Sequence, residues 1–233
     1  MKNILYLFSV LLILVISSCK KESNSKQDID ISRYTNLSKV LTYDLNSIGN
    51  KVRESKGNFL DPKSVLNVAE KYYCAESEEF DSFQQSFNLA KSNSVKSDEL
   101  TALQAKGVYE ITVALATSSS ALDFTKFLNT KFDEVLNSNL EIQDKDFLLM
   151  YITSYVAGIE FINNNLDIIS PKVFQSKGWW DSWGKCAAGI VGGVIGGGLV
   201  GGAAGSVIPI LGTTGGLIVG GIGGGLAGAA EYC

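Results

Sequence analysis

The sequence contains no histidine, three prolines and two methionines among its 233 residues. Without histidine the chain lacks the usual general base of enzymes, the Ser-His and Cys-His nucleophile pairs, and the commonest ligand of zinc and iron sites. Carboxylates remain, but no spacing among them indicates a hydrolytic pair. We therefore expect no enzymatic activity, no bound metal and no cofactor.

Positive charge is also scarce, because the net charge is −4 and no segment forms a basic patch. This composition argues against binding to nucleic acid. The one dense group of carboxylates, which comprises Glu76, Glu78, Glu79 and Asp81, indicates a solvated face or loop rather than a metal cluster.

The chain carries no charge from Ala187 to Ala230, and glycine fills 18 of the 45 positions from Cys186 to Ala230. A four-residue spacing places side chains on one face of an α-helix, so a ladder of glycines at that spacing lets another backbone approach closely. The intervening residues are Ile, Val and Leu, which favours membrane packing over a flexible linker. One ladder comprises Gly189, Gly193, Gly197, Gly201 and Gly205, and the other comprises Gly212, Gly216, Gly220, Gly224 and Gly228.

Two cysteines bracket this tract. With a turn around 208–212, one helix runs back about 22 residues to Cys186 and the other forward about 21 residues to Cys233, each about 32 Å long. Each arm matches the roughly 30 Å hydrocarbon thickness of a bilayer. An antiparallel hairpin brings both sulfurs to one end, so we predict a Cys186–Cys233 disulfide within a glycine hairpin over 186–233. Cys74, within a predicted amphipathic helix, is expected to be a small buried apolar residue.

The first 18 residues form a signal peptide, with Lys2 before an apolar run from Ile4 to Ile16. The ending Ile16-Ser17-Ser18-Cys19 resembles a bacterial lipobox, which implies lipidation of Cys19. An ordinary signal peptide with a coincidental cysteine is the alternative. Residues 19–30 then form a solvated tether, and the mature chain is extracytoplasmic, where disulfides are permitted. Lys20 and Lys21 differ from the acidic residues that retain lipoproteins in the inner membrane, so the resemblance implies the outer membrane.

Residues 31–172 are predicted to form a soluble bundle of about five helices, because their apolar positions recur at three and four residues. The second helix begins at Asp61-Pro62, the third at Ser97-Asp98 with Leu103 in its apolar stripe, the fourth runs from Ser120 to Leu140, and the fifth, expected to be central, from Asp146 to Ile169. The first has a stripe comprising Tyr34, Leu37, Leu41, Leu45, Ile48 and Val52.

The linker 173–185 holds all three tryptophans of the chain, Trp179, Trp180 and Trp183. Tryptophan favours the interface between membrane and water, and the position before an uncharged tract favours that location over a core aromatic cluster. The expected fold is therefore all-α, with a soluble bundle followed by a glycine-zipper membrane hairpin.

The glycine tract resembles the glycine-zipper domain of envelope lipoproteins, and it also looks like glycine-rich class II bacteriocins and microcins. The first resemblance implies a lipid-anchored envelope protein whose hairpin associates with the lipid bilayer and self-associates into a homo-oligomer. The second implies an antibacterial toxin that permeabilises a target membrane, with cleavage near Gly178 as one route to release the hairpin. A third hypothesis is that residues 31–172 bind an unknown protein partner.

Overall fold

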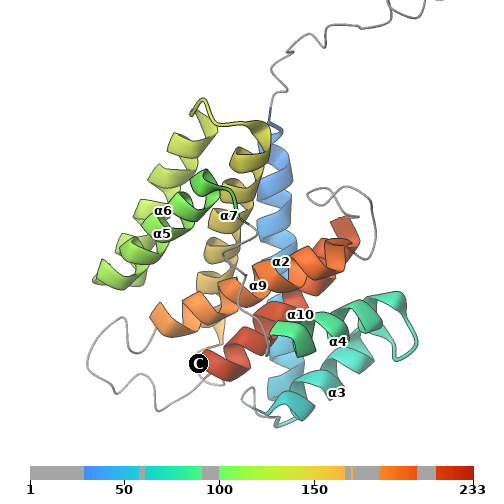
Figure 1. The fold of residues 1–233 in the computed structure, drawn as a ribbon. Helices are drawn as coiled ribbons and strands as arrows, with labels where there is room; N and C mark the ends of the chain where they lie inside the picture. The colour runs from blue at the N-terminus through green and yellow to red at the C-terminus, as the bar shows by residue number, and fades with distance from the viewer. Residues whose placement is uncertain (1–28, 58–60, 91–99, 166–168, 170–183, 204–213) are drawn as a thin grey trace, which may run out of the picture.

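The computed structural model describes residues 29–57, 61–90, 100–165, 169, 184–203 and 214–233. These residues form eight α-helices and no strand, so the predicted all-α class is confirmed. Helices α9 and α10 lie between α2 and α7 on one side and α4 on the other (Figure 1). The helices are α2 (Ile31–Glu54), α3 (Pro62–Tyr73), α4 (Glu78–Ala90), α5 (Ala102–Thr117), α6 (Ala121–Leu136), α7 (Ile142–Asn164), α9 (Lys185–Ala203) and α10 (Thr214–Tyr232).

Side-chain caps determine where several helices begin. Helix α3 begins at Pro62 after Asp61, as predicted, and the Asp61 carboxylate accepts a hydrogen bond from the backbone N–H of Lys63. Helix α6 begins at Ala121, one residue after the predicted start at Ser120, and Ser120 is its N-cap. The hydroxyl of Ser120 accepts a hydrogen bond from the backbone N–H of Asp123 at 3.2 Å.

The predicted start of the third helix at Ser97-Asp98 is wrong. Helix α5 begins at Ala102, because Thr101 and Gln104 form a reciprocal capping box. The buried face of α5 also differs from the apolar stripe predicted for this helix, because Leu103, a member of that stripe, is 46% exposed.

Helix α7 begins at Ile142, four residues before the predicted start at Asp146. Asp144 and Asp146 therefore lie inside the helix, where each is 6% exposed. Both carboxylates accept hydrogen bonds from neighbouring helices or their caps, Asp144 from Thr101 at 2.7 Å and Asp146 from Arg33 at 2.9 Å. These bonds explain why two acidic residues are tolerated in a buried helix.

Two helices end earlier than predicted, and an asparagine follows each of them. Helix α6 ends at Leu136 instead of Leu140, and the side-chain amide of Asn137 donates to the carbonyl of Asp133 at 2.8 Å. Helix α7 ends at Asn164, and Asn165 likewise donates to the carbonyl of Phe161 at 2.8 Å. Such side-chain bonds compete with continuation of the helix.

The predicted helix through Cys74 is broken, and the expectation that Cys74 is buried is wrong. Cys74 is exposed and has a φ of 70°, a left-handed conformation that ends α3 after Tyr73. The hydroxyl of Ser77 then accepts a hydrogen bond from the backbone N–H of Phe80 near the start of α4. This break gives six described helices between residues 31 and 172 instead of about five.

One hydrophobic core contains buried residues from all eight described helices. Helix α7 is central to it, as predicted, because fifteen of its residues are buried. The six residues of the α2 stripe are also buried, which confirms the first predicted helix. Gly158 of α7 lies against Ile190 and Val191 of α9, so the C-terminal helices share this core.

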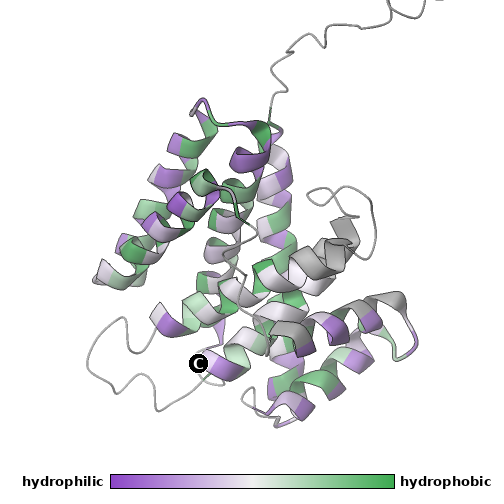
Figure 2. Cartoon of the chain, in the orientation of Figure 1, coloured by the Kyte–Doolittle hydropathy of each residue, from purple (hydrophilic) through white to green (hydrophobic). Residues whose placement is uncertain are grey.

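The sequence predicts a bundle followed by a separate hairpin, whereas α9 and α10 pack inside the bundle. The two helices have no polar face to turn toward water, so burial of their apolar side chains against the other helices is favoured. In Figure 2 the hydrophilic positions of the described parts of α9 and α10 gather at their outer ends, where Lys185 and Glu231 lie. Within the described part of the chain, no helix has the length and hydrophobicity required to cross a membrane.

The Tyr73 hydroxyl supplies a test of the packing between α3 and α4. It is buried and finds no hydrogen-bond partner among the described residues, and burial raises its pKa. Tyr73→Phe removes this oxygen and keeps the ring contacts with Tyr72 and Phe83. We expect the free energy of unfolding to rise by about 1 kcal/mol, measured by urea denaturation. The control is Tyr72→Phe, which loses a 2.9 Å hydrogen bond to Asp44 and should lower the free energy of unfolding. A Tyr73→Phe protein that is less stable than the parent would contradict the absence of a partner for the Tyr73 hydroxyl.

Candidate functional site

The candidate site is the α9–α10 pair, where the two glycine ladders lie against one another. A Cβ atom added to Gly193 would lie 2.0 Å from the carbonyl oxygen of Gly224, and one added to Gly197 would lie 2.1 Å from that of Gly220. Real Cβ atoms do not approach oxygen so closely, so only glycine permits this separation. The two backbones themselves form the interface.

The contacts step along the two helices in opposite directions. A Cβ atom added to Gly228 would lie 2.0 Å from the carbonyl oxygen of Gly189. Further along the pair, Gly224 lies against Gly193, and Gly220 lies against Gly197. The helices are therefore antiparallel. The structure brings together six of the ten ladder glycines in this way, namely Gly189, Gly193, Gly197, Gly220, Gly224 and Gly228.

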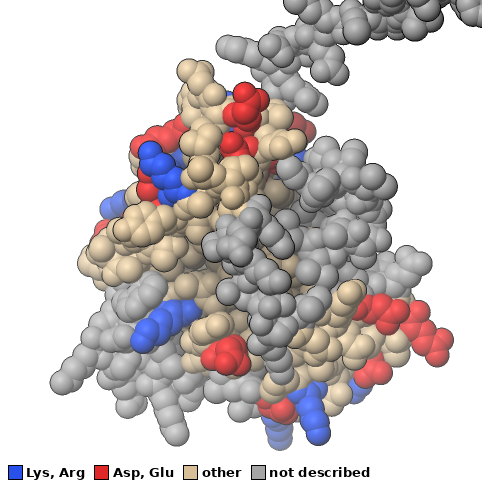
Figure 3. Space-filling view, in the orientation of Figure 1, with Lys and Arg blue, Asp and Glu red and all other residues tan. Residues whose placement is uncertain are grey.

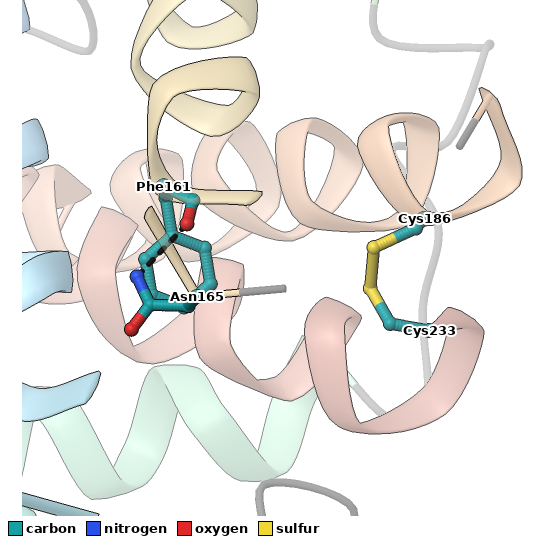
Figure 4. The surroundings of a disulfide bond; sticks show 4 residues. All are labelled: Phe161, Asn165, Cys186 and Cys233. Carbon is teal, nitrogen blue, oxygen red and sulfur yellow. Dashed lines mark hydrogen bonds between the residues drawn. A yellow bond between two sulfur atoms is a disulfide. The ribbon is translucent and has the colours of Figure 1, made fainter. Parts of the chain in front are cut away.

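A disulfide joins Cys186 and Cys233 at the end of the pair where α9 begins and α10 ends (Figure 4). The Cα atoms of the two cysteines are 4.5 Å apart, and Cys186 is 2% exposed. The bond spans 47 positions of the sequence. It therefore ties the two helices together beside the Gly189–Gly228 contact, as the predicted hairpin requires.

Outside the glycine interface, apolar residues of the pair pack against the bundle. Val194 of α9 lies against Gly221 and Gly225 of α10, and these two glycines also face Leu41 and Leu45 of α2. Fully buried side chains of the pair include Ile190, Val191, Ile222 and Leu226. Hence the glycine faces meet each other, while the branched side chains meet the surrounding helices.

Helix α4 covers α10 on the side opposite α2. A Cβ atom added to Gly223 would lie 2.5 Å from the carbonyl oxygen of Phe83, so these helices also approach closely. The hydroxyl of Ser86 is fully buried and donates to the carbonyl of Gly197 at 3.2 Å. Ser86 thus links α4 to α9 across the junction of three helices.

Several predicted site residues lie outside the described residues, namely Cys19, Trp179, Trp180, Trp183, Gly205 and Gly212. Gly201 and Gly216 lie within α9 and α10. Sequence reasoning missed Ser86 and Gly223. Ser86 occurs in an ordinary amphipathic helix, and Gly223 lies off the ladder that faces α9.

Polar groups elsewhere serve packing rather than chemistry. Burial, together with the hydrogen bond to Asp146, raises the pKa of the Tyr34 hydroxyl. The predicted solvated carboxylates include Glu76 and Asp81, which are exposed, and acidic side chains gather in Figure 3 where α3 passes into α4. No group of three or more acidic or cysteine residues in the described chain is arranged to hold a metal ion.

Two cavities lie beside the bundle helices. One of about 40 Å³ between α2, α7 and α9 is lined mainly by apolar side chains such as Leu37, Phe147 and Val194, and it has room for little more than a water molecule. A groove of about 370 Å³ lies between α2, α6 and α7, with Tyr34 and Lys39 in its lining. Neither contains a cluster of groups suited to catalysis.

The ladder contacts can be tested with two neighbouring glycines. Gly193→Ala places a methyl group within 2.0 Å of the Gly224 carbonyl, whereas a Cβ at Gly192 meets nothing within 4 Å. We expect Gly193→Ala to lower the free energy of unfolding by about 2–3 kcal/mol, since the helices must separate. Gly192→Ala should raise it by up to about 1 kcal/mol through helix propensity. Equal urea midpoints for the two variants would exclude the close contact.

The disulfide has its own test. Replacing both Cys186 and Cys233 by serine opens the loop that the disulfide closes across 47 positions of the sequence. This change should lower the free energy of unfolding by about 4 kcal/mol. The matched control is Cys74→Ser, which alters an exposed free thiol and should change it by less than about 0.5 kcal/mol. Thermal unfolding of the three proteins measures the difference, and identical melting temperatures are incompatible with the bond.

Comparison of the chain with protein-family models, with curated protein sequences and with solved structures finds no match. The functional argument therefore starts from the geometry of α9 and α10. Its main elements are a helix pair with charged residues at Lys185 and Glu231 near its ends, a backbone interface made of glycine, and a disulfide at one end.

Proposed function

We propose that this chain is a lipid-anchored bacterial envelope protein whose α9–α10 pair associates with a membrane. The observation that carries the proposal is the pairing, through their backbones, of two glycine-rich helices whose charged residues are Lys185 and Glu231 at their ends.

The packing supports transfer of the pair between the bundle and lipid as one unit. The glycine contacts and the disulfide lie within the pair, so they persist when its surroundings change. The surfaces that change partners carry side chains such as Ile190 and Leu226, which are as compatible with lipid as with a protein core. Helical hydrogen bonding satisfies the backbone in either environment.

The N-terminus supplies the proposed location. Lipidation of Cys19, followed by a tether to Asp30, holds the bundle near a membrane on the extracytoplasmic side, with the outer membrane favoured over the inner. A Cys186–Cys233 disulfide is compatible with that compartment. Trp179, Trp180 and Trp183 would then anchor the start of α9 at the interface between lipid and water.

Self-association is part of the proposal, but it needs a surface other than the ladders. Six ladder glycines already face one another within the chain. Gly192 lies off that interface, and an added Cβ there meets nothing within 4 Å. We therefore expect copies of the chain to meet along the side of α9 that carries Gly192.

One observation favours a second function, that of a bacteriocin-like toxin. The pair contributes to the hydrophobic core of the bundle, as a protein would need if it carried an apolar element through water to another cell's membrane. Release of a dye from vesicles distinguishes the two functions. An envelope protein binds and leaves the vesicles sealed, whereas a permeabilising protein releases the dye.

Membrane association is tested with the full secreted chain carrying Cys19→Ser, so that no lipid anchor holds it to vesicles. We expect it to float with vesicles of phosphatidylethanolamine and phosphatidylglycerol. Ile195→Lys places a charge on the partly buried side of α9 and should reduce binding about a hundredfold, since a central lysine costs roughly 2.5–3.5 kcal/mol in lipid.

Leu122→Lys is the control, because Leu122 is 63% exposed on α6 and lies outside the pair. Circular dichroism checks that both variants remain folded. Absence of vesicle binding by the parent protein, or equal losses in both lysine variants, would refute the membrane role of the pair.

A further inference from the structure

We propose that α4 is a removable cover, and that the face of α9 and α10 beneath it is the surface that first meets a lipid bilayer. This inference rests on the proposed membrane association of the pair. It adds which helix must leave and which side of the pair then contacts lipid.

The packing of α4 differs from that of the other helices around the pair. Within the described part of the chain, α4 packs mainly on α10 and α9, with a smaller contact to α3. Helices α2 and α7 pack on each other, and α7 also packs on α5 and α6. Departure of α4 therefore leaves that four-helix frame intact, whereas departure of α2 or α7 would dismantle it.

Helix α4 has two contrasting faces. Phe80, Phe83 and Phe87 are buried, and Phe83 and Phe87 stack with their ring centroids 5.9 Å apart. Asp81 and Gln84 on the other side are exposed. A helix with one aromatic face and one polar face is suited to lie at the interface of a bilayer, so α4 has a place to go when lipid replaces it.

The contact between α4 and the pair is close, and the polar bonding found among its described side chains comes from Ser86. Phe83 rests on Gly223 through its backbone, and Ser86 donates one hydrogen bond to the carbonyl of Gly197. When α4 leaves, water can satisfy the Ser86 hydroxyl. The surface then uncovered includes Gly220 and Gly223, which have no polar side chain and which lipid can cover.

Helix α3 can remain in place while α4 moves. The hydroxyl of Tyr72 donates to Asp44 of α2 at 2.9 Å, and Val65 is fully buried. Between the two helices, Cys74 has a left-handed backbone and the N–H of Ser77 donates to its carbonyl. This turn is the point about which α4 would rotate.

The test compares two fully buried phenylalanines, Phe83 of α4 and Phe124 of α6. Each stacks on a phenylalanine of its own helix, Phe87 and Phe127 respectively. In the Cys19→Ser chain, Phe83→Leu should raise the partition coefficient onto phosphatidylethanolamine–phosphatidylglycerol vesicles about tenfold, as expected for a cover weakened by about 1.4 kcal/mol. Phe124→Leu should leave the partition coefficient unchanged, although it should lower the thermal stability by a similar amount.

Hydrogen exchange on the parent chain gives an independent measurement. On addition of vesicles, amides of α4 should lose protection, while those of α7 and of the α9–α10 pair keep it. Equal increases in vesicle binding for both leucine variants would refute the role of α4 as a cover but not the membrane role of the pair. Vesicle binding with the amides of α4 still protected would have the same meaning. If none of the proteins binds vesicles, the membrane role fails and the cover fails with it.

Discussion

The structure depends on the direct contact between the backbones of α9 and α10. At Gly193 and Gly224 the two chains are so close that a single methyl group on either would collide with the opposite carbonyl. Glycine weakens an isolated helix by about 1 kcal/mol per residue relative to alanine, so these helices need packing to persist. The mutual ladder and the Cys186–Cys233 disulfide supply it from within the pair.

That contact determines what the rest of the bundle must do. Because the glycine faces are turned toward each other, the remaining surface of the pair carries Ile190, Val191 and Ile222, which have to be kept from water. Helices α2, α4 and α7 provide the cover. Gly158 on α7 and Gly223 on α10 show that this cover also relies on missing side chains, since each glycine lets a neighbouring helix approach.

Periodic features of the sequence were sufficient to predict several of the elements but not their association. The α2 stripe, the Asp61 cap, the helix that begins near Ser120 and the antiparallel relation of Cys186 to Cys233 all follow from local spacing. The burial of Asp144 and Asp146 could not be predicted, because their partners Thr101 and Arg33 come from distant segments. The exposure of Cys74 depends on one backbone angle, which an amphipathic pattern does not encode.

The placement of the pair inside the bundle also has a physical reason that local spacing does not reveal. An uncharged glycine tract gives the same signal whether its apolar faces meet lipid or protein, since both environments are dry. What distinguishes a protein environment from lipid is that other helices carry groups complementary to the pair, such as the buried Ser86 hydroxyl that donates to the Gly197 carbonyl. The ladder and the disulfide are common to both environments, so they stabilise the pair without choosing between them. In the proposed membrane association, the choice between the bundle core and a bilayer therefore depends on the helices that cover the pair, and among the described helices α4 is the one that packs mainly on the pair.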